Sequence, residues 1–230
     1  MFSFFREKEL KFFLDKPLGL IYFKEKGEVE MRDEMDVLKE VATIAAAHGS
    51  NALSEILKRT IKLSLPLVTT VTPDNLEKEI DSDEIVLSVQ SRILSGIEGK
   101  VLLVLEEKSA FRLINICCKG EDKATSGFLT EVGLSAVKEI GNVVIGSYVG
   151  ALSMFLKLLI VPSIPTLISG PLYEVVSSAL SLEKEHILMI EAVFEESEEK
   201  IKGKMYFVLT QRGREIINQA CDKILESLEK

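Results

Sequence analysis

The feature of this sequence that most constrains its fold is an internal repeat. Residues 36–66, DVLKEVATIAAAHGSNALSEILKRTIKLSLP, align without a gap with residues 135–165, SAVKEIGNVVIGSYVGALSMFLKLLIVPSIP. Further along, IEGKVLLVL at 97–105 matches IKGKMYFVL at 201–209. Because the matched segments follow one another in the same order, the chain is predicted to be a duplication with a pseudo-twofold architecture.

Each half is predicted to begin with helical structure. Apolar residues at helical spacing indicate a first helix over about 34–48 and again over about 129–146. The motif ALS, at 52–54 and 151–153, indicates the start of a second short helix, which a proline then ends. Two separate helices are therefore expected in each half before the first strand.

Strands and a closing helix are predicted to follow. Runs rich in aliphatic residues predict strands at EIVLSVQ, KVLLVLE, HILMIEAVF and KMYFVLT. Closing helices are expected at about 109–118 and 212–228. The proline-bearing runs 66–73 and 162–171 are candidate edge strands whose pairing the sequence does not settle. Short connections between strands favour an antiparallel sheet.

The repeat also defines the domain organisation. Residues 34–230 are predicted to form a single domain made of two repeats, 34–118 and 129–228, joined by the polar linker KGEDKATSGF. Residues 1–33 lie outside the repeat and hold six of the eleven Phe residues. This N-terminal extension is either an extra pair of strands or a helix covering the core, or a docking segment for a partner.

Composition and charge exclude several classes of function. The net charge is −8, and no stripe of Lys and Arg alternates with aromatic residues, so nucleic acid is not an expected partner. The three cysteines, Cys117, Cys118 and Cys221, form no CxxC motif and have no neighbouring His. They are interpreted as reduced structural thiols of a cytoplasmic protein, not as a metal or redox site.

One apolar stretch, residues 141–172, approaches the composition of a membrane span. Lys157 interrupts it, and prolines follow soon after. The matching segment of the first repeat carries Glu55 and Arg59 where this stretch has Met154 and Leu158. No membrane-spanning segment is therefore expected.

The candidate site is a pair of polar residues, Glu139 and Asn142, in an otherwise apolar helical segment. Residues at i and i+3 share one face of a helix, so the carboxylate and the amide are expected to lie within about 6 Å of each other. Gly141 and Gly146 are expected to keep the surface low, so that another macromolecule can approach the helix closely.

The chemistry of this pair suits a protein that completes the active site of a partner. An amide donates and accepts hydrogen bonds at once, so Asn142 can hold a water in line with a phosphoryl group. Glu139 can pair with a Lys of the partner. The pair includes no nucleophile, no His base and no set of metal ligands. From spacing alone, such a pair is also typical of an ordinary solvated helix face.

The segments LKEVATIAAAHGSNALS and VKEIGNVVIGSYVGALS resemble the doubled signature of the CheC/CheX/FliY chemotaxis phosphatases, and their arrangement is closest to CheC. The resemblance covers about residues 34–228, and Ser135 also fits the pattern. It implies an α/β (α+β) fold, a pseudo-twofold domain with one central antiparallel sheet and two exposed signature helices. It further implies dephosphorylation of the aspartyl-phosphate on a CheY-type response regulator, in which Asn142 orients the attacking water and Glu139 pairs with the active-site Lys of the regulator.

The same resemblance implies that the chain has no cofactor or metal of its own, because the phosphorylated regulator supplies the Mg²⁺. In the first repeat Glu40 is in place, but Thr43 stands at the Asn position. This second site is therefore expected to be degenerate, although its helix can still bind the regulator through Glu40. CheD is a further partner that the family resemblance suggests.

Two other functions stay open. A chain with one degenerate site can be a non-catalytic binding module for phosphorylated CheY or CheD, or a structural relative of the flagellar switch proteins. The intact EIGN at 139–142 favours the phosphatase, since a purely structural descendant has no need of the amide. Elsewhere, the acidic run at 195–200 is interpreted as a solvated hairpin loop, and His48 as a surface or cap residue at the end of its helix.

Overall fold

The computed structural model describes residues 34–64, 66–72, 76, 80, 84–117, 130–180 and 187–228. The N-terminal extension 1–33, the whole linker 119–128 and Cys118 lie outside the described residues. The predictions made for them stay predictions.

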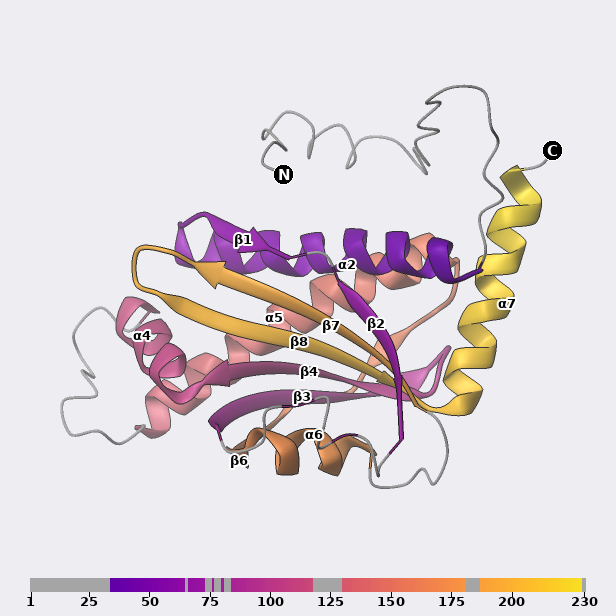
Figure 1. The fold of residues 1–230 in the computed structure, drawn as a ribbon. Helices are drawn as coiled ribbons and strands as arrows, with labels where there is room; N and C mark the ends of the chain where they lie inside the picture. The colour runs from indigo at the N-terminus through magenta and orange to yellow at the C-terminus, as the bar shows by residue number, and fades with distance from the viewer. Residues whose placement is uncertain are drawn as a thin grey trace. The chain divides into compact units, whose positions relative to one another are not determined.

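The described residues include five helices that cover or flank one sheet (Figure 1). The helices are α2 (Glu34–Leu57), α4 (Glu107–Cys117), α5 (Glu131–Leu156), α6 (Leu172–Leu180) and α7 (Gln211–Leu228). The strands in the same part of the chain are β1 (Ile61–Leu63), β2 (Leu67–Val71), β3 (Ile85–Ser95), β4 (Gly99–Glu106), β5 (Val161–Pro162), β6 (Thr166–Pro171), β7 (Ile187–Glu196) and β8 (Ile201–Leu209). The closing helices α4 and α7 agree with the predicted ranges to within two residues.

Every strand pairing in the described sheet is antiparallel, which confirms the predicted fold class. The strand order is β1-β7-β8-β4-β3-β5, with β2 also paired to β7 and β6 also paired to β3. This order is unchanged when each strand is exchanged for its counterpart in the other repeat. The edge strands of each repeat therefore pair with the other repeat, which settles the pairing that the sequence left open.

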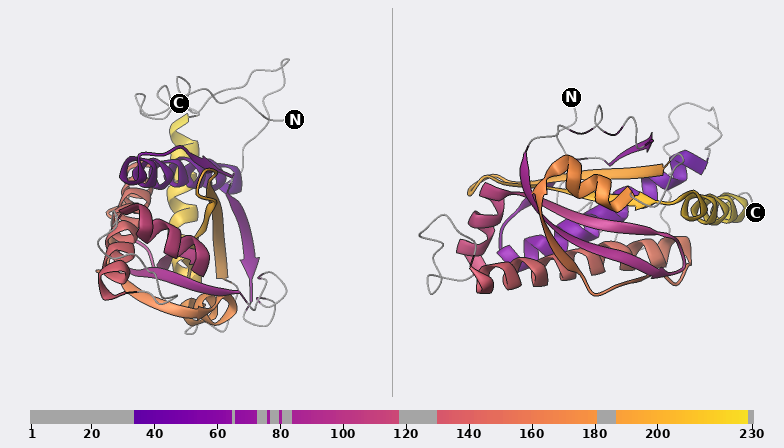
Figure 2. Two further views of the ribbon diagram at one scale, coloured as in Figure 1. Left: turned by 90° about the vertical axis from the view of Figure 1, so that its left-hand side faces the viewer. Right: turned by 90° about the horizontal axis from the view of Figure 1, so that it is seen from below.

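Helices α2 and α5 cover one face of the sheet (Figures 1 and 2). The ring of Tyr148 on α5 meets Phe207 of β8 edge-on, with centroids 6.0 Å apart. The two helices pack closely at Gly49 of α2, where an added Cβ would lie 3.6 Å from the Cβ of Tyr148. Tyr148 is the residue that matches Gly49 in the repeat, so the helices cross at equivalent points.

The opposite face of the sheet is covered by α6. Its buried residues Leu172, Val175 and Val176 belong to one apolar cluster with Val86 of β3 and Leu102 of β4. This helix was not predicted. The segment LYEVVSSAL follows Pro171 directly and is rich in residues that favour strands, so local propensity gave little sign of a helix.

The prediction of two helices in each half is wrong, because α2 and α5 are each continuous. The ALS motif lies at the end of a helix and not at the start of one. Lys58 and Lys157, equivalent in the repeat, end the two helices in the left-handed conformation, with φ of 55° and 53°. The hydroxyl of Ser54 donates to the carbonyl of Arg59, and that of Ser153 to the carbonyl of Leu158. Both serines therefore satisfy a backbone group just beyond the helix end.

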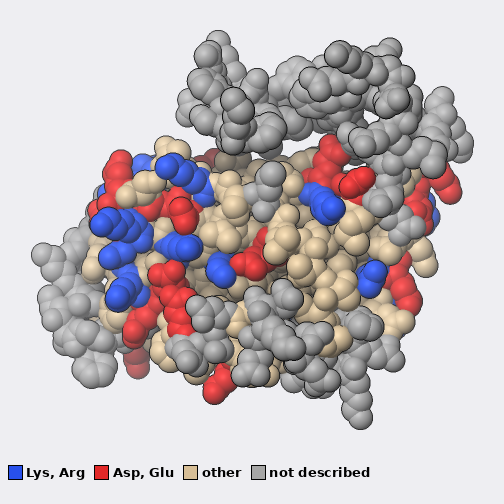
Figure 3. All heavy atoms as spheres, viewed as in Figure 1, with Lys and Arg blue, Asp and Glu red and all other residues tan. Residues whose placement is uncertain are grey.

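The acidic run at 195–200 is only partly a solvated loop. Residues 197–200 form the exposed turn between β7 and β8, but Glu196 is buried. Its carboxylate accepts hydrogen bonds from the backbone N–H groups of Glu198 (2.9 Å) and Glu199 (2.7 Å). Arg59 forms ion pairs with Glu196, Glu198 and Glu199. Figure 3 shows charged side chains of both signs gathered at this end of the sheet.

The apolar composition of α5 is explained by packing within the protein. By length and composition alone, α5 qualifies as a helix able to cross a membrane, and 56% of its apolar window is buried in the fold. Its buried residues face the sheet and α2. Cys221 is fully buried on α7, in agreement with a core role, whereas Cys117 is half-buried.

Candidate functional site

The candidate site lies on the outer side of α5. This helix starts at Thr130, whose hydroxyl accepts a hydrogen bond from the backbone N–H of Gly133 at 3.1 Å and so caps the first turn. Downstream, Val137, Ile140 and Val144 are buried beneath the helix. Glu139 and Asn142, between them in sequence, are exposed on the opposite side.

Gly141 fixes this orientation, but not in the way the sequence suggested. It is buried, and a Cβ at this position would lie 2.6 Å from the Cβ of Val89 on β3. The backbone of α5 therefore rests directly on the sheet at this point. The expectation that Gly141 opens the outer surface is wrong. Gly146 is exposed and has no atom within 4 Å of an added Cβ. The helix backbone is therefore open to a partner at Gly146 and not at Gly141.

The surface around the pair is suited to contact with another protein. Within the described part of the chain, neither Glu139 nor Asn142 has a hydrogen-bond or ion-pair partner. Val143 beside them is 42% exposed, and Val132, nearer the start of α5, is 57% exposed. The pair therefore has hydrogen-bonding groups available to a partner, with the exposed apolar side chain of Val143 directly beside it.

The matching pair in the first repeat has a different environment. Glu40 and Thr43 are half-buried on α2, whereas Glu139 and Asn142 are exposed on α5. The hydroxyl of Thr43 donates to the backbone carbonyl of Lys39 at 2.7 Å. This bond to the preceding turn of the same helix turns the only polar group of Thr43 away from a partner.

His48 does not lie at a helix end, because α2 continues to Leu57. It is half-buried in the middle of the helix, and burial lowers its pKa below the ordinary value. Among the described residues, no group of three His, Cys, Asp or Glu side chains is placed to hold a metal ion.

Comparisons with known proteins agree with this signature. A model of the CheC-like family matches residues 132–169, which include both Glu139 and Asn142. The CheY-P phosphatase CheC of Bacillus subtilis is 27% identical over 191 residues, which cover 76% of this chain and 88% of CheC. The solved structure of Thermotoga maritima FliY superposes with a TM-score of 0.67 at 24% identity, over 85% of this chain and 99% of that one.

The chain is thus similar to proteins of the CheC/FliY family in its signature segment, in sequence and in fold. The flagellar motor switch phosphatase FliY of B. subtilis is also 27% identical, over 120 residues. That match covers 52% of this chain but only 31% of FliY, so most of that relative has no counterpart in it.

Two further structures show how widely this fold is used. The middle domain of FliM from H. pylori has a TM-score of 0.56 at 13% identity, over 83% of this chain and 99% of that domain. CheX of Borrelia burgdorferi, solved in complex with CheY, BeF3 and Mg²⁺, has a TM-score of 0.50 at 17% identity, over 74% of this chain and 97% of CheX. These likenesses establish a common fold and do not decide the activity of this chain.

Proposed function

We propose that this protein hydrolyses the aspartyl-phosphate of a CheY-type response regulator at the surface formed by Glu139 and Asn142. The observation that supports it most directly is that both side chains are exposed on the outer side of α5 and free of partners in the described part of the chain. Its relatives include proteins named as phosphatases of CheY-P and a CheX that forms a complex with CheY.

In this mechanism α5 docks against the phosphorylated regulator. The Asn142 amide accepts a hydrogen bond from a water and orients its oxygen toward phosphorus. A bond forms between that oxygen and phosphorus while the bond to the aspartyl oxygen breaks, which releases inorganic phosphate and the free carboxylate. Glu139 pairs with a Lys of the regulator and fixes the register of the complex.

The contribution of each residue follows from its role. Positioning one water is worth about 10²-fold in rate, or about 2.7 kcal/mol. A single ion pair at a solvent-exposed interface is worth about 1 kcal/mol at most, or roughly fivefold in affinity. In this proposal the Mg²⁺ belongs to the regulator, as the resemblance to the CheC/CheX/FliY phosphatases implies. Binding of CheD also stays a prediction.

The deciding experiment measures phosphate release from a phosphorylated CheY-type regulator with Mg²⁺ present. Asn142→Ala should reduce the acceleration of phosphate release about 10²-fold. Thr43→Ala, the matching substitution in the first repeat, should change the acceleration little. Glu139→Gln should weaken binding of the regulator more than it slows turnover at saturation.

Two outcomes would replace this proposal. If the wild-type protein binds the phosphorylated regulator without accelerating release, the chain is a capture module. If it neither binds nor accelerates, the flagellar-switch alternative takes its place.

A further inference from the structure

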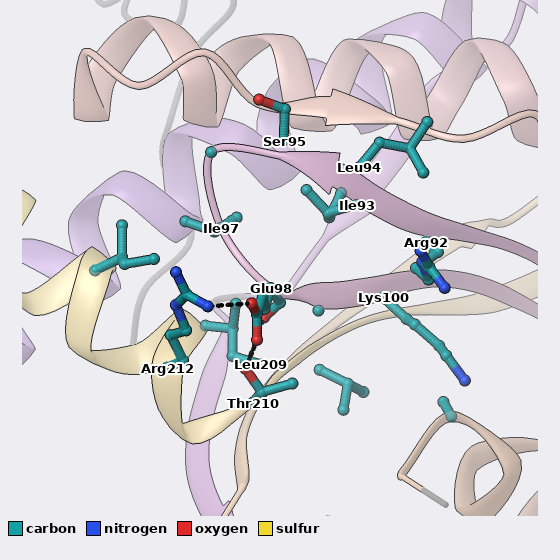
Figure 4. A pocket seen from close by; sticks show the side chains of 15 residues that line it. Arg92, Ile93, Leu94, Ser95, Ile97, Glu98, Lys100, Leu209, Thr210 and Arg212 are labelled. Carbon is teal, nitrogen blue, oxygen red and sulfur yellow. Dashed lines mark hydrogen bonds and ion pairs between the residues drawn. The ribbon is translucent and has the colours of Figure 1, made fainter. Parts of the chain in front are cut away.

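A second concave site lies away from α5, at the end of the sheet where the β3–β4 hairpin meets the start of α7 (Figure 4). The cavity has a volume of about 450 Å³, within the range of small-molecule sites. Part of its lining is apolar and includes Leu94, Val208 and Leu209. The rest carries several charged side chains, of which three are cations.

Two of these cations, Arg92 and Lys100, face each other across neighbouring strands. They are directly opposite in the β3–β4 register. Like charges directly opposite each other destabilise a sheet, so this arrangement costs stability. Burial and the charge of Arg92 both lower the pKa of Lys100, as expected for a cation that lacks a compensating anion.

The carboxylate in the cavity does not neutralise them. Glu98 is bound to Arg212 at 3.1 Å and to the hydroxyl of Thr210 at 3.5 Å, and Figure 4 shows it turned toward both. Lys100 donates instead to the backbone carbonyl of Ser178 at 3.0 Å. Within the described ranges, neither Arg92 nor Lys100 has a carboxylate at ion-pair distance.

The repeat supplies an internal comparison. Lys204 is the counterpart of Lys100 in the motif shared by β4 and β8. Lys204 forms an ion pair with Glu191 at 3.1 Å, so the matched position in the second repeat is neutralised. The unneutralised pair therefore belongs to the β3–β4 end, and it occurs there together with a cavity.

We propose that this cavity binds a small phosphorylated molecule, with its phosphate between Arg92 and Lys100 and its organic body against the exposed side chain of Leu94. A phosphate dianion matches the charge of the cation pair, and the planar guanidinium of Arg92 can donate to two phosphate oxygens at once. Because Glu98 is paired with Arg212, its carboxylate repels the bound phosphate less strongly. None of these residues lies on α5, so the site is independent of the proposed phosphatase activity.

The test uses phenylphosphonate, which has a phosphorus oxyanion and an apolar ring and carries no hydrolysable ester. Calorimetric titration at constant ionic strength should show binding to the full-length protein, and inorganic phosphate should bind more weakly. Arg92→Gln and Lys100→Gln should each weaken phenylphosphonate binding at least tenfold, whereas Lys204→Gln, the matched control, should leave it unchanged. In the wild-type protein, backbone amide NMR signals of residues 95–98 should shift on titration, which does not depend on any variant folding.

Several results would overturn the inference. Absence of both binding and amide shifts at millimolar phenylphosphonate would exclude the site. Equal loss in Lys204→Gln would show that general surface charge is responsible. Binding of benzoate in preference to phenylphosphonate would refute the assignment of a phosphate.

Discussion

The packing of α5 on the sheet predicts opposite effects for two glycine-to-alanine substitutions in the same helix. Alanine is favoured over glycine in a helix interior by about 1 kcal/mol. Gly146 is exposed, with no atom within 4 Å of an added Cβ, so Gly146→Ala should gain this amount in full. At Gly141 the added Cβ would meet the Cβ and both Cγ atoms of Val89 at 2.6 to 2.7 Å.

Because the Cβ of Val89 is itself too close, no rotation of that side chain relieves the clash at Gly141. Ordinary carbon contacts need about 3.5–4.0 Å, so α5 must move away from β3 by about 1 Å. Such overpacking costs about 3 kcal/mol at the upper end, which leaves Gly141→Ala about 2 kcal/mol less stable than wild type after the helix gain. The two variants should therefore differ by about 3 kcal/mol, or roughly 6–12 °C in melting temperature.

Urea unfolding of the two variants measures this difference, provided that the m-value is unchanged. Val89→Ala in the Gly141→Ala background is the control, because it removes the two Cγ contacts but keeps the Cβ contact, so it should recover only part of the lost stability through a coupling between the two positions. If Gly141→Ala is as stable as Gly146→Ala, the close approach of α5 to β3 is wrong. The outward orientation of Glu139 and Asn142 would then lose its structural basis.

Three further predictions follow from single contacts. Ser153→Ala removes the hydrogen bond to the Leu158 carbonyl and should lower the free energy of unfolding by about 1 kcal/mol. Ser147→Ala, on the same helix, should lower it less, and equal losses in urea titrations would contradict this prediction. Burial lowers the pKa of His48 in the folded state, so the unfolded chain binds more protons and the free energy of unfolding should fall as the pH drops below about 6.5. His48→Ser, which introduces the residue found at the matching position of the second repeat, should flatten this part of the pH–stability curve. An unchanged curve would exclude His48 as the source of the pH dependence. Gly146→Leu should keep the fold but slow dephosphorylation of the regulator at least tenfold, because the side chain rises from the surface one turn beyond Asn142; an unchanged rate would place the docking surface elsewhere.

The repeat made much of this fold predictable, because a duplicated pattern of strands and helices restricts the chain to a few symmetric arrangements. Local sequence patterns gave wrong predictions where tertiary packing determines the structure. The ALS motif suggested a break, yet close packing of α2 at Gly49 against Tyr148 favours a continuous helix. Likewise, Gly141 was assigned to the open surface because its burial against Val89 depends on a strand about fifty residues away in sequence.

Polar residues showed the same limit. The acidic run at 195–200 resembled an ordinary loop, and only the fold brings Arg59 to Glu196. Arg92 and Lys100 drew no attention in the sequence, because strand register and not spacing places them opposite each other. Glu139 and Asn142 could be proposed from the sequence because one local motif on a single helix contains both residues. Sites assembled across strands leave no such local pattern.

The inequality of the two repeats gives the last prediction, for a chain that carries Asn142→Ala and Thr43→Asn together. The second change restores a Glu/Asn pair in the first repeat and removes the hydroxyl that bonds to the Lys39 carbonyl. The two side chains of the proposed site are then present, but Glu40 and position 43 are half-buried on α2. Because the regulator must contact the amide directly and a half-buried position restricts that contact, we expect the rate of phosphate release from the regulator to stay at least tenfold below the wild-type rate. Full recovery would show that the residue at position 43 alone separates an active helix from an inactive one, and that exposure plays no part.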